Sequence, residues 1–224
     1  MFFMARGLVL FDLDGTLIDT APDLCGAANR LRIALGLEPL AYEDLRPFAG
    51  TGAKGLLAKA LDVFPDNPQY PELRARFLSD YSEHMRDNTA PFAGIDAVLK
   101  DLAADGKRWG IVTNKAMYLA GPLVQDLIGP IAEPDVLIAG DTTPKMKPAP
   151  DSLLEAARRL AYPVTECLYI GDEQRDITAA CAARMSSIAA LWGYGTDAQN
   201  WGATALARRV SELPDLINTL LVTS

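Results

Sequence analysis

The sequence predicts an α/β fold: a mainly parallel sheet with helices on both faces, interrupted soon after its first strand by an all-helical insertion. Three observations predict it. A short apolar run at residues 8–11 has the character of a buried strand. Residues 18–89 carry helical periodicity and no convincing strand. From residue 90 onward, strand-like and helix-like segments alternate, which is typical of βαβ units.

The insertion is expected to begin with a helix. Thr20 and Asp23 have the spacing of a capping box, and apolar residues then recur at helical intervals. A second helix is expected to end at Pro47, because proline cannot continue it. In the last helix of the insertion, apolar residues recur every four positions. The expected helices cover residues 24–35, 42–46, 53–61 and 73–85.

The second part of the chain supplies the other expected strands. Short apolar runs rich in β-branched residues predict strands, and longer periodic segments between them predict helices. The sequence therefore predicts a core from residues 1–17 and 90–224, with the helical domain at 18–89. The expected strands lie at 109–113, 136–139, 167–170 and 187–191, and the expected helices at 95–102, 116–127, 152–160, 177–183 and 213–221.

Composition and charge limit the possible partners. The 224 residues are 50% apolar and 22% charged, an ordinary globular composition. Acidic residues number 29 against 21 lysines and arginines, so the net charge is −8. We therefore expect no binding to nucleic acid or to an anionic membrane surface. An anionic substrate would need a few local cations or a bound metal.

The sequence also indicates a cytoplasmic protein. No apolar stretch is long enough to span a bilayer, and residues 1–6 lack the pattern of a signal peptide, although Met4 is a second candidate start. The three cysteines are odd in number and lack Cys-x-x-Cys spacing, so we expect reduced thiols. The single histidine offers little basis for a Ser-His-Asp or multi-histidine metal site. A monomer or a homodimer is expected.

Polar side chains gather where the predicted strands end. In open parallel sheets, ligands bind beyond the carboxyl ends of the strands. Several carboxylates at one point repel each other unless a proton or a cation is present, and oxygen ligands favour a hard cation such as Mg²⁺. Hydroxyl, amide and lysine groups suit phosphoryl oxygens. The residues concerned are Asp12, Asp14, Thr113, Asn114, Lys147, Asp172 and Asp176.

Two of these carboxylates have the spacing for phosphoryl chemistry. An aspartate such as Asp12 can attack phosphorus and so split one difficult step into two. A second carboxyl two residues away, Asp14, can protonate the leaving group and later deprotonate the attacking water.

The same residues carry a family resemblance. The segment Asp12-Leu13-Asp14-Gly15-Thr16 resembles the first motif of the haloacid dehalogenase-like hydrolases. Thr113-Asn114 is similar to their second motif, Lys147-Pro148 to the third, and Gly171-Asp172-x-x-x-Asp176 to the fourth. The resemblance covers nearly the whole chain. It implies a Rossmann-like core with an inserted helical cap domain.

The resemblance also implies roles for these residues. Asp12 is expected to be the nucleophile and Asp14 the general acid and base. Thr113 and Asn114 are expected to contact the transferring phosphoryl group, whose charge Lys147 steadies. Mg²⁺ is expected to be bound by Asp12, the backbone carbonyl of Asp14, and Asp172, while Asp176 supports Lys147 or a metal-bound water.

The expected activity is that of a phosphomonoesterase. The dehalogenase branch of the family typically lacks the second aspartate of the first motif, so Asp14 favours phosphoryl chemistry. The sequence resembles phosphoglycolate phosphatases most, and the segment Asn200-Trp201-Gly202-Ala203 is similar to the sister group of N-acetylmuramate-phosphate phosphatases. Other sugar-phosphate phosphatases, a phosphomutase and a non-catalytic binding protein stay open as alternatives.

Three further positions bear on this expectation. Lys54 lies between glycines in the insertion, and it is the candidate cation for the carboxylate of a small phosphate ester. Glu173 stands where relatives often have Asp or Ser, which leaves its contact with the metal shell open. Arg184 stands where relatives usually have a glycine that ends a helix, which affects local backbone geometry more than chemistry.

Overall fold

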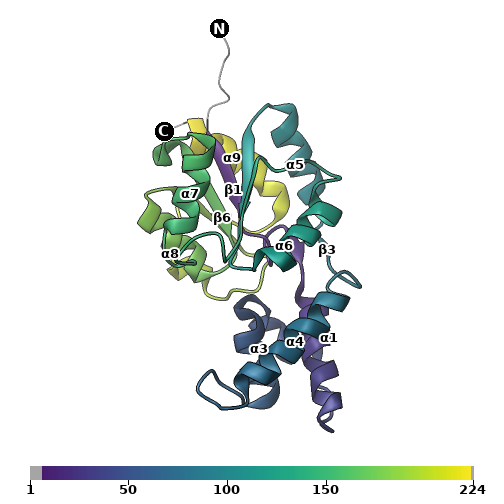
Figure 1. Ribbon diagram of the computed structural model, residues 1–224. Coiled ribbons are helices and arrows are strands. Elements are labelled where there is room, and N and C mark those ends of the chain that lie inside the picture. The colour runs from purple at the N-terminus through teal and green to yellow at the C-terminus, as the bar shows by residue number, and fades with distance from the viewer. Residues whose placement is uncertain (1–6, 223–224) are drawn as a thin grey trace. The chain divides into compact units, whose positions relative to one another are not determined.

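The computed structural model describes residues 7–222 (Figure 1). The inferences on the N-terminal hexapeptide, including Met4 as a second start, lie outside these residues. Contacts divide the chain into two compact units. Within the described residues, one unit comprises 7–18 and 91–222, and the other is Asp19–Ala90.

The first unit is built on a parallel sheet. In the described part of the chain it has six strands in the order β5-β4-β1-β6-β7-β8, which confirms the α/β fold class. The chain runs from β1 outward on one side, then returns to the other side of β1 with β6. A ligand crevice is expected at such a reversal of strand order. The strands are β1 (Leu8–Phe11), β4 (Arg108–Val112), β5 (Val136–Ile138), β6 (Cys167–Gly171), β7 (Ser186–Ala190) and β8 (Ala205–Ala207).

Helices cover both faces of this sheet (Figure 1). The helices α7 (Asp151–Leu160) and α8 (Gln174–Ala183) pack together on one face, and α5 (Ile95–Ala104) and α9 (Leu213–Val222) pack together on the other. Every residue of β1 is buried, as expected of a strand with helices on both of its faces. The central strand is therefore a rigid support for the residues that follow it.

The second unit is helical. Its four apolar side chains at intervals of four, which predicted the last helix, are all buried. Phe77 and Tyr81 from this series stack with their ring centroids 6.5 Å apart. Helix α1 packs against both α3 and α4. The helices are α1 (Ala21–Ala34), α2 (Tyr42–Leu45), α3 (Gly52–Leu61) and α4 (Tyr70–His84).

The expected capping box at the start of α1 is wrong. Thr20 makes no side-chain capping bond. The Asp23 carboxylate instead accepts hydrogen bonds from the backbone N–H groups of Asn88 and Thr89 and from the Thr89 hydroxyl. A distant segment thus outcompetes the local partner for this carboxylate, which ties the first helix of the unit to its last residues.

Several local elements differ from expectation. Strand β2 (Ile18–Asp19) pairs with β3 (Ala90–Pro91), and β8 was not expected. Pro47 does not end the helical path, because a 3₁₀ helix continues over Arg46–Thr51. Pro122 lies within α6 (Met117–Leu123), which passes into a π-helix at Val124–Ile128. Further 3₁₀ helices cover Val164–Glu166, Ala198–Asn200 and Val210–Glu212.

Within residues 7–222, none of the helices combines the length and the apolar character that a membrane crossing requires.

Arg184 ends α8 in the left-handed region, with φ at +59°. The family resemblance implies a glycine at this position, and a side chain there carries a steric cost. We expect Arg184→Gly to be more stable than Arg184→Ala by about 0.5–1 kcal/mol, because only glycine relieves the strain. Both variants lose the same charge, so urea unfolding of the pair isolates the backbone effect. Equal stability of the two would contradict the assignment.

Candidate active site

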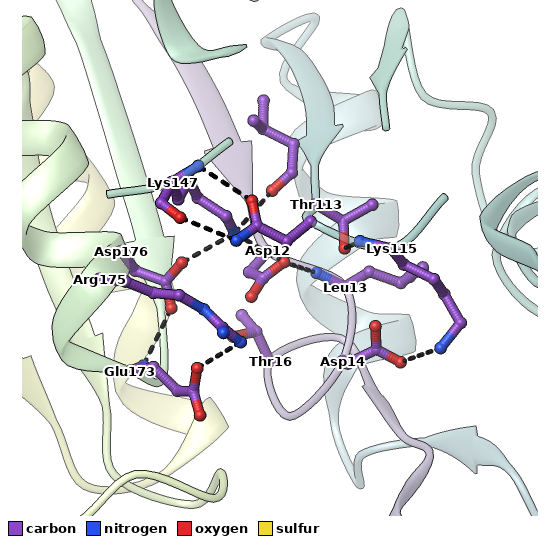
Figure 2. A network of polar contacts seen from close by, with 12 residues as sticks. Asp12, Leu13, Asp14, Thr16, Thr113, Lys115, Lys147, Glu173, Arg175 and Asp176 are labelled. Carbon is purple, nitrogen blue, oxygen red and sulfur yellow. Dashed lines mark hydrogen bonds and ion pairs between the residues drawn. The ribbon is translucent and has the colours of Figure 1, made fainter. Parts of the chain in front are cut away.

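Apart from Lys54, the sequence-predicted residues gather around the carboxyl ends of β1, β4 and β6, and Figure 2 labels five of them: Asp12, Asp14, Thr113, Lys147 and Asp176. The Asp12 N–H donates to the Ile170 carbonyl at 2.8 Å, and the Thr113 N–H donates to the Ile138 carbonyl at 2.9 Å. Each residue thus extends the ladder of its strand by one bond. Because the ladder fixes the backbone, the side chains of Asp12 and Thr113 start from defined positions.

Lys147 connects the carboxylates of this cluster. Its Nζ lies 2.9 Å from Asp12 Oδ1 and 2.7 Å from Asp176 Oδ1. It also donates to the Tyr169 hydroxyl at 2.7 Å and to the Val112 carbonyl at 3.1 Å. The Lys147 side chain has no solvent exposure. A buried ammonium is tolerated only with such partners, because it has left its hydration shell.

Burial and neighbouring charges set the ionisation of this pair. Burial tends to lower the pKa of Lys147, but the charges of Asp12 and Asp176 outweigh burial and raise it above its ordinary value. Burial raises the pKa of Asp12 from 3.8 to about 6, although Lys147 acts in the opposite direction. The folded protein therefore binds the Asp12 proton more tightly than the unfolded chain does. As a result, the contribution of Asp12 to folding stability falls as the pH rises from about 3.8 to about 6. Near neutral pH, the metal-free protein carries this cost in full.

Asp172 lies in a cradle of close backbone. Its Oδ1 accepts from the Thr16 hydroxyl at 2.9 Å, and its Oδ2 accepts from the Tyr194 N–H at 2.8 Å. Gly15 has φ at +82°, and a Cβ there would collide with the Asp172 carboxylate. Burial, with the charges of Asp176 and Asp12, raises the pKa of Asp172 well above its ordinary value. The glycine thus permits both the turn and the close approach.

The donor set of this cluster fits a hard divalent cation. Among the residues that the structure describes, Asp12, Asp172 and Asp176 offer carboxylate oxygens that all lie within 4.8 Å of one another. All three residues are buried. Burial raises the pKa of both Asp12 and Asp172, and the charge of Asp176 adds to the rise in each. A cation among these oxygens would remove the repulsion. An aspartate cluster that can hold a metal is therefore present.

Asp14 has a different cation partner. Its Oδ1 lies 2.8 Å from Lys115 Nζ, and Figure 2 shows its carboxylate directed toward that lysine. The Thr113 hydroxyl oxygen accepts from the Lys115 N–H at 3.2 Å, so its own hydrogen can donate to a phosphoryl oxygen. The two acids of the first motif are thus each matched with a separate lysine.

Asn114 is engaged by the loop that carries Lys147. Its Nδ2 donates to the Lys147 carbonyl at 2.9 Å, and its Oδ1 accepts from the Lys147 N–H at 3.0 Å. This placement favours a role in fixing the loop over the phosphoryl contact that the sequence suggests. The peptide bond between Lys147 and Pro148 is cis.

Asp176 and Glu173 form the capping box of α8. Asp176 Oδ2 accepts from the Glu173 N–H at 2.9 Å, while its other oxygen holds Lys147. The Glu173 carboxylate forms an ion pair with Arg175. Burial raises the pKa of Glu173, and Arg175 opposes the rise. The first turn of α8 therefore has backbone N–H groups capped by its own side chains, and it also brings the Asp176 carboxylate into contact with the Lys147 ammonium.

Sequence reasoning missed Tyr169, Lys115 and Arg175 as site residues. Tyr169 has the sequence context of a buried strand residue. Its hydroxyl places it in the site, because that oxygen accepts from Lys147 Nζ at 2.7 Å and donates to the Val112 carbonyl at 2.8 Å. Lys115 follows the second motif directly, which is a usable signal. Lys54, by contrast, lies in the helical unit, exposed in the first turn of α3.

Comparison with known proteins decides the family. Residues 9–190 match the haloacid dehalogenase-like hydrolases. The chain belongs to this family. It is 42% identical over 204 residues to a phosphoglycolate phosphatase of Xylella fastidiosa, covering 90% of this chain and 88% of that protein. It is 36% identical over 216 residues to an N-acetylmuramic acid 6-phosphate phosphatase of Pseudomonas aeruginosa, covering 95% of each. These relatives place this hydrolase among the phosphatases of the family.

The solved structures agree on the fold. A haloacid dehalogenase-like family hydrolase of Streptococcus pneumoniae superposes with a TM-score of 0.82 at 22% identity, covering 95% of this chain and 98% of that one. At this identity the likeness concerns the fold alone.

The metal cluster can be tested without an activity assay. We expect Mg²⁺ at 100 times its dissociation constant to stabilise the chelator-treated protein by about 2.7 kcal/mol. Asp172→Asn is expected to lose this response, because one charged ligand is gone. In the metal-free state at pH 7.5 it is expected to melt about 2–4 °C higher than the wild type, because it removes a buried carboxylate while Thr16 and Tyr194 can still bond the amide. Thermal melts with and without Mg²⁺ measure both effects. An equal Mg²⁺ shift in both proteins would remove Asp172 from the metal site.

Proposed function

We propose that this hydrolase is a Mg²⁺-dependent phosphomonoesterase of the cytoplasm and that its substrate is phosphoglycolate. The observation that carries the proposal is the buried Lys147 ammonium bridging Asp12 and Asp176 at the end of the central strand. The relative from Xylella fastidiosa supports the choice of substrate. Free thiols at the three cysteine positions support the compartment. The proposed partner is this small phosphate ester, handled by a monomer or homodimer.

In the first half of the reaction, Asp12 attacks phosphorus and forms an aspartyl-phosphate. Its Oδ1 is held by the Leu13 N–H at 2.8 Å as well as by Lys147, so the carboxylate keeps one orientation. Asp14 gives its proton to the leaving oxygen. The Thr113 hydroxyl and the Lys147 ammonium bind the negative charge of the transferring group.

In the second half, water hydrolyses the aspartyl-phosphate. Asp14, now ionised, accepts the proton of the attacking water. Lys147 stays between Asp12 and Asp176 throughout, which limits the charge that accumulates at the nucleophile. Mg²⁺, held by Asp12, the Asp14 carbonyl and Asp172, would neutralise phosphoryl oxygens.

N-acetylmuramic acid 6-phosphate is the second candidate substrate. The relative from Pseudomonas aeruginosa that carries this name is similar over 95% of the chain, a longer match than that of the Xylella fastidiosa relative. Both substrates combine a phosphate ester with a carboxylate. The two differ in size, so the choice between them depends on residues other than those that contact the phosphoryl group.

A panel of metabolite phosphates tests the proposal. With Mg²⁺ present, we expect the highest kcat/KM for phosphoglycolate, and we expect Asp12→Asn to abolish phosphate release from every substrate because no aspartyl-phosphate can form. Phosphate release measured by colorimetry is the readout. A sugar bisphosphate primer added in parallel would expose phosphomutase activity. A higher kcat/KM for N-acetylmuramic acid 6-phosphate would replace the first substrate with the second.

Lys54 is the proposed cation for the substrate carboxylate. It is exposed at the start of α3, beside Gly52, whose φ of +60° only glycine adopts readily. We expect Lys54→Ala to raise KM for phosphoglycolate by about 10-fold, a loss of one charge-assisted bond, and to change KM for p-nitrophenyl phosphate far less. Lys59→Ala, which removes the same charge from an exposed site on the same helix, is the matched control. Equal losses on both substrates would make Lys54 structural.

A further inference from the structure

The ion pair between Lys115 and Asp14 is not explained by the nucleophilic, phosphoryl-binding or metal-binding roles proposed above. The two side chains are 7% and 19% exposed, and their charged atoms lie 2.8 Å apart. Asp12 and Asp14 are two residues apart at the end of one strand, yet Figure 2 shows Asp12 in contact with Lys147 and Asp14 turned toward Lys115. Each acid of the first motif therefore has a lysine of its own.

The backbone of Lys115 is held at both of its polar groups. Its N–H donates to the Thr113 hydroxyl oxygen at 3.2 Å, and its carbonyl accepts from the Gly140 N–H at 2.9 Å. Gly140 lies so close to the Asn114 backbone that a Cβ there would collide with it. The loops after β4 and β5 thus fix Lys115 from two sides, and its ammonium starts from a rigid base.

We infer that Lys115 is a positioning residue for Asp14, which it acts on by fixing where the carboxylate lies. The inference rests on the proposed role of Asp14 as proton donor. In the first half-reaction the O–H bond of Asp14 breaks as the P–O bond breaks. The proton goes to the leaving oxygen, and the electron pair stays on the Asp14 carboxylate. In the second half-reaction that carboxylate must lie where it can take a proton from the attacking water.

Position matters for such a transfer because the proton moves only over hydrogen-bond distance. Asp14 is partly exposed, so without a fixed partner its carboxylate would rotate and be solvated. Lys147 cannot fix the Asp14 carboxylate, because its ammonium already contacts Asp12, Asp176, the Tyr169 hydroxyl and the Val112 carbonyl. Lys115 is the cation that the structure places on Asp14.

The dependence of the rate on the leaving group tests this inference. Departure of an alkoxide needs a proton from Asp14, whereas p-nitrophenolate leaves without one. We expect Lys115→Met to lower kcat/KM at least 10-fold more for the best alkyl phosphate of the substrate panel than for p-nitrophenyl phosphate, a fraction of the about 10²–10⁴-fold that acid catalysis contributes. Lys115→Arg is expected to restore at least half of this selectivity on a logarithmic scale, because it keeps a cation beside Asp14.

Three further variants separate positioning from a structural role. Lys107→Met removes a lysine that pairs with Asp105 at 2.5 Å in the same unit, and it is expected to leave the alkyl-to-aryl ratio at the wild-type value. Asp14→Asn is expected to lower the ratio more than Lys115→Met does. In the double variant, the lysine substitution is expected to cause no further fall in the ratio, because Lys115 acts through Asp14. Circular dichroism and thermal melts establish that each variant is folded.

Three results would overturn the inference. An equal loss on both substrates in Lys115→Met would make the lysine structural. A gain on the alkyl phosphate would mean that Lys115 restrains Asp14 instead of positioning it. Equal loss on both substrates in Asp14→Asn would refute the proton donor itself and the inference with it, whereas a selective loss there without one in Lys115→Met refutes Lys115 alone.

Discussion

The buried ammonium of Lys147 is the interaction on which the site depends. Two carboxylates at the end of a fully buried strand and a helix start would repel each other, and the lysine between them makes the arrangement tolerable. The Asn114 side chain holds the loop that carries Lys147, and the Tyr169 hydroxyl and the Val112 carbonyl offer two oxygen acceptors for the third N–H of its ammonium. The sheet, one loop and one helix therefore converge on a single nitrogen atom.

The two lysines divide the site into a buried half around Lys147 and a partly exposed half around Lys115. On the Lys147 side lie the proposed nucleophile Asp12 and the other residues that can hold a metal, all of them buried. On the Lys115 side lies the partly exposed Asp14. Proton transfer needs contact with a leaving group and with water, whereas nucleophilic attack is favoured by a dry and rigid environment. A short segment of the first motif spans both environments because β1 ends at Phe11 and the chain turns at Gly15, so Asp12 and Asp14 do not share one face of a strand.

Much of the fold could be predicted from the sequence, and the reasons are physical. The central strand is an uninterrupted apolar run, and the helices of the insertion have regular apolar periodicity; both patterns arise from burial. The missed strands are too short to show such a pattern, since β2 and β8 are two and three residues long. The capping box at α1 was wrong for another reason: Asp23 accepts a hydrogen bond from Asn88, which is 65 residues away in the sequence. On α7, Leu153 is fully buried whereas Leu154 is 40% exposed, because helical periodicity does not distinguish the edge of the apolar face from its centre.

The site residues divide in the same way. Motif spacing named the residues that the strand ends bring together, since the topology alone decides their convergence. It did not reveal that Lys115 meets Asp14. Lys115 and Tyr169 contact residues 101 and 22 positions away, and such pairings depend on side-chain geometry that no local pattern carries. Likewise, the amide of Asn114 is a group that can bind phosphate, but in the structure it makes two hydrogen bonds with the backbone of Lys147.

The position of β1 in the sheet has a consequence for how the molecule comes into being. This strand is made first, yet it pairs with β4 and with β6, which are made after the whole helical insertion. The Thr16 hydroxyl finds its partner, Asp172, 156 residues later. Contacts of such long range form slowly, because the chain must close a large loop before any of them repays the cost. We expect the helical unit, whose contacts are local, to take shape on the ribosome well before Asp12 meets Lys147, so that the site is complete only once the last strands of the sheet are in place.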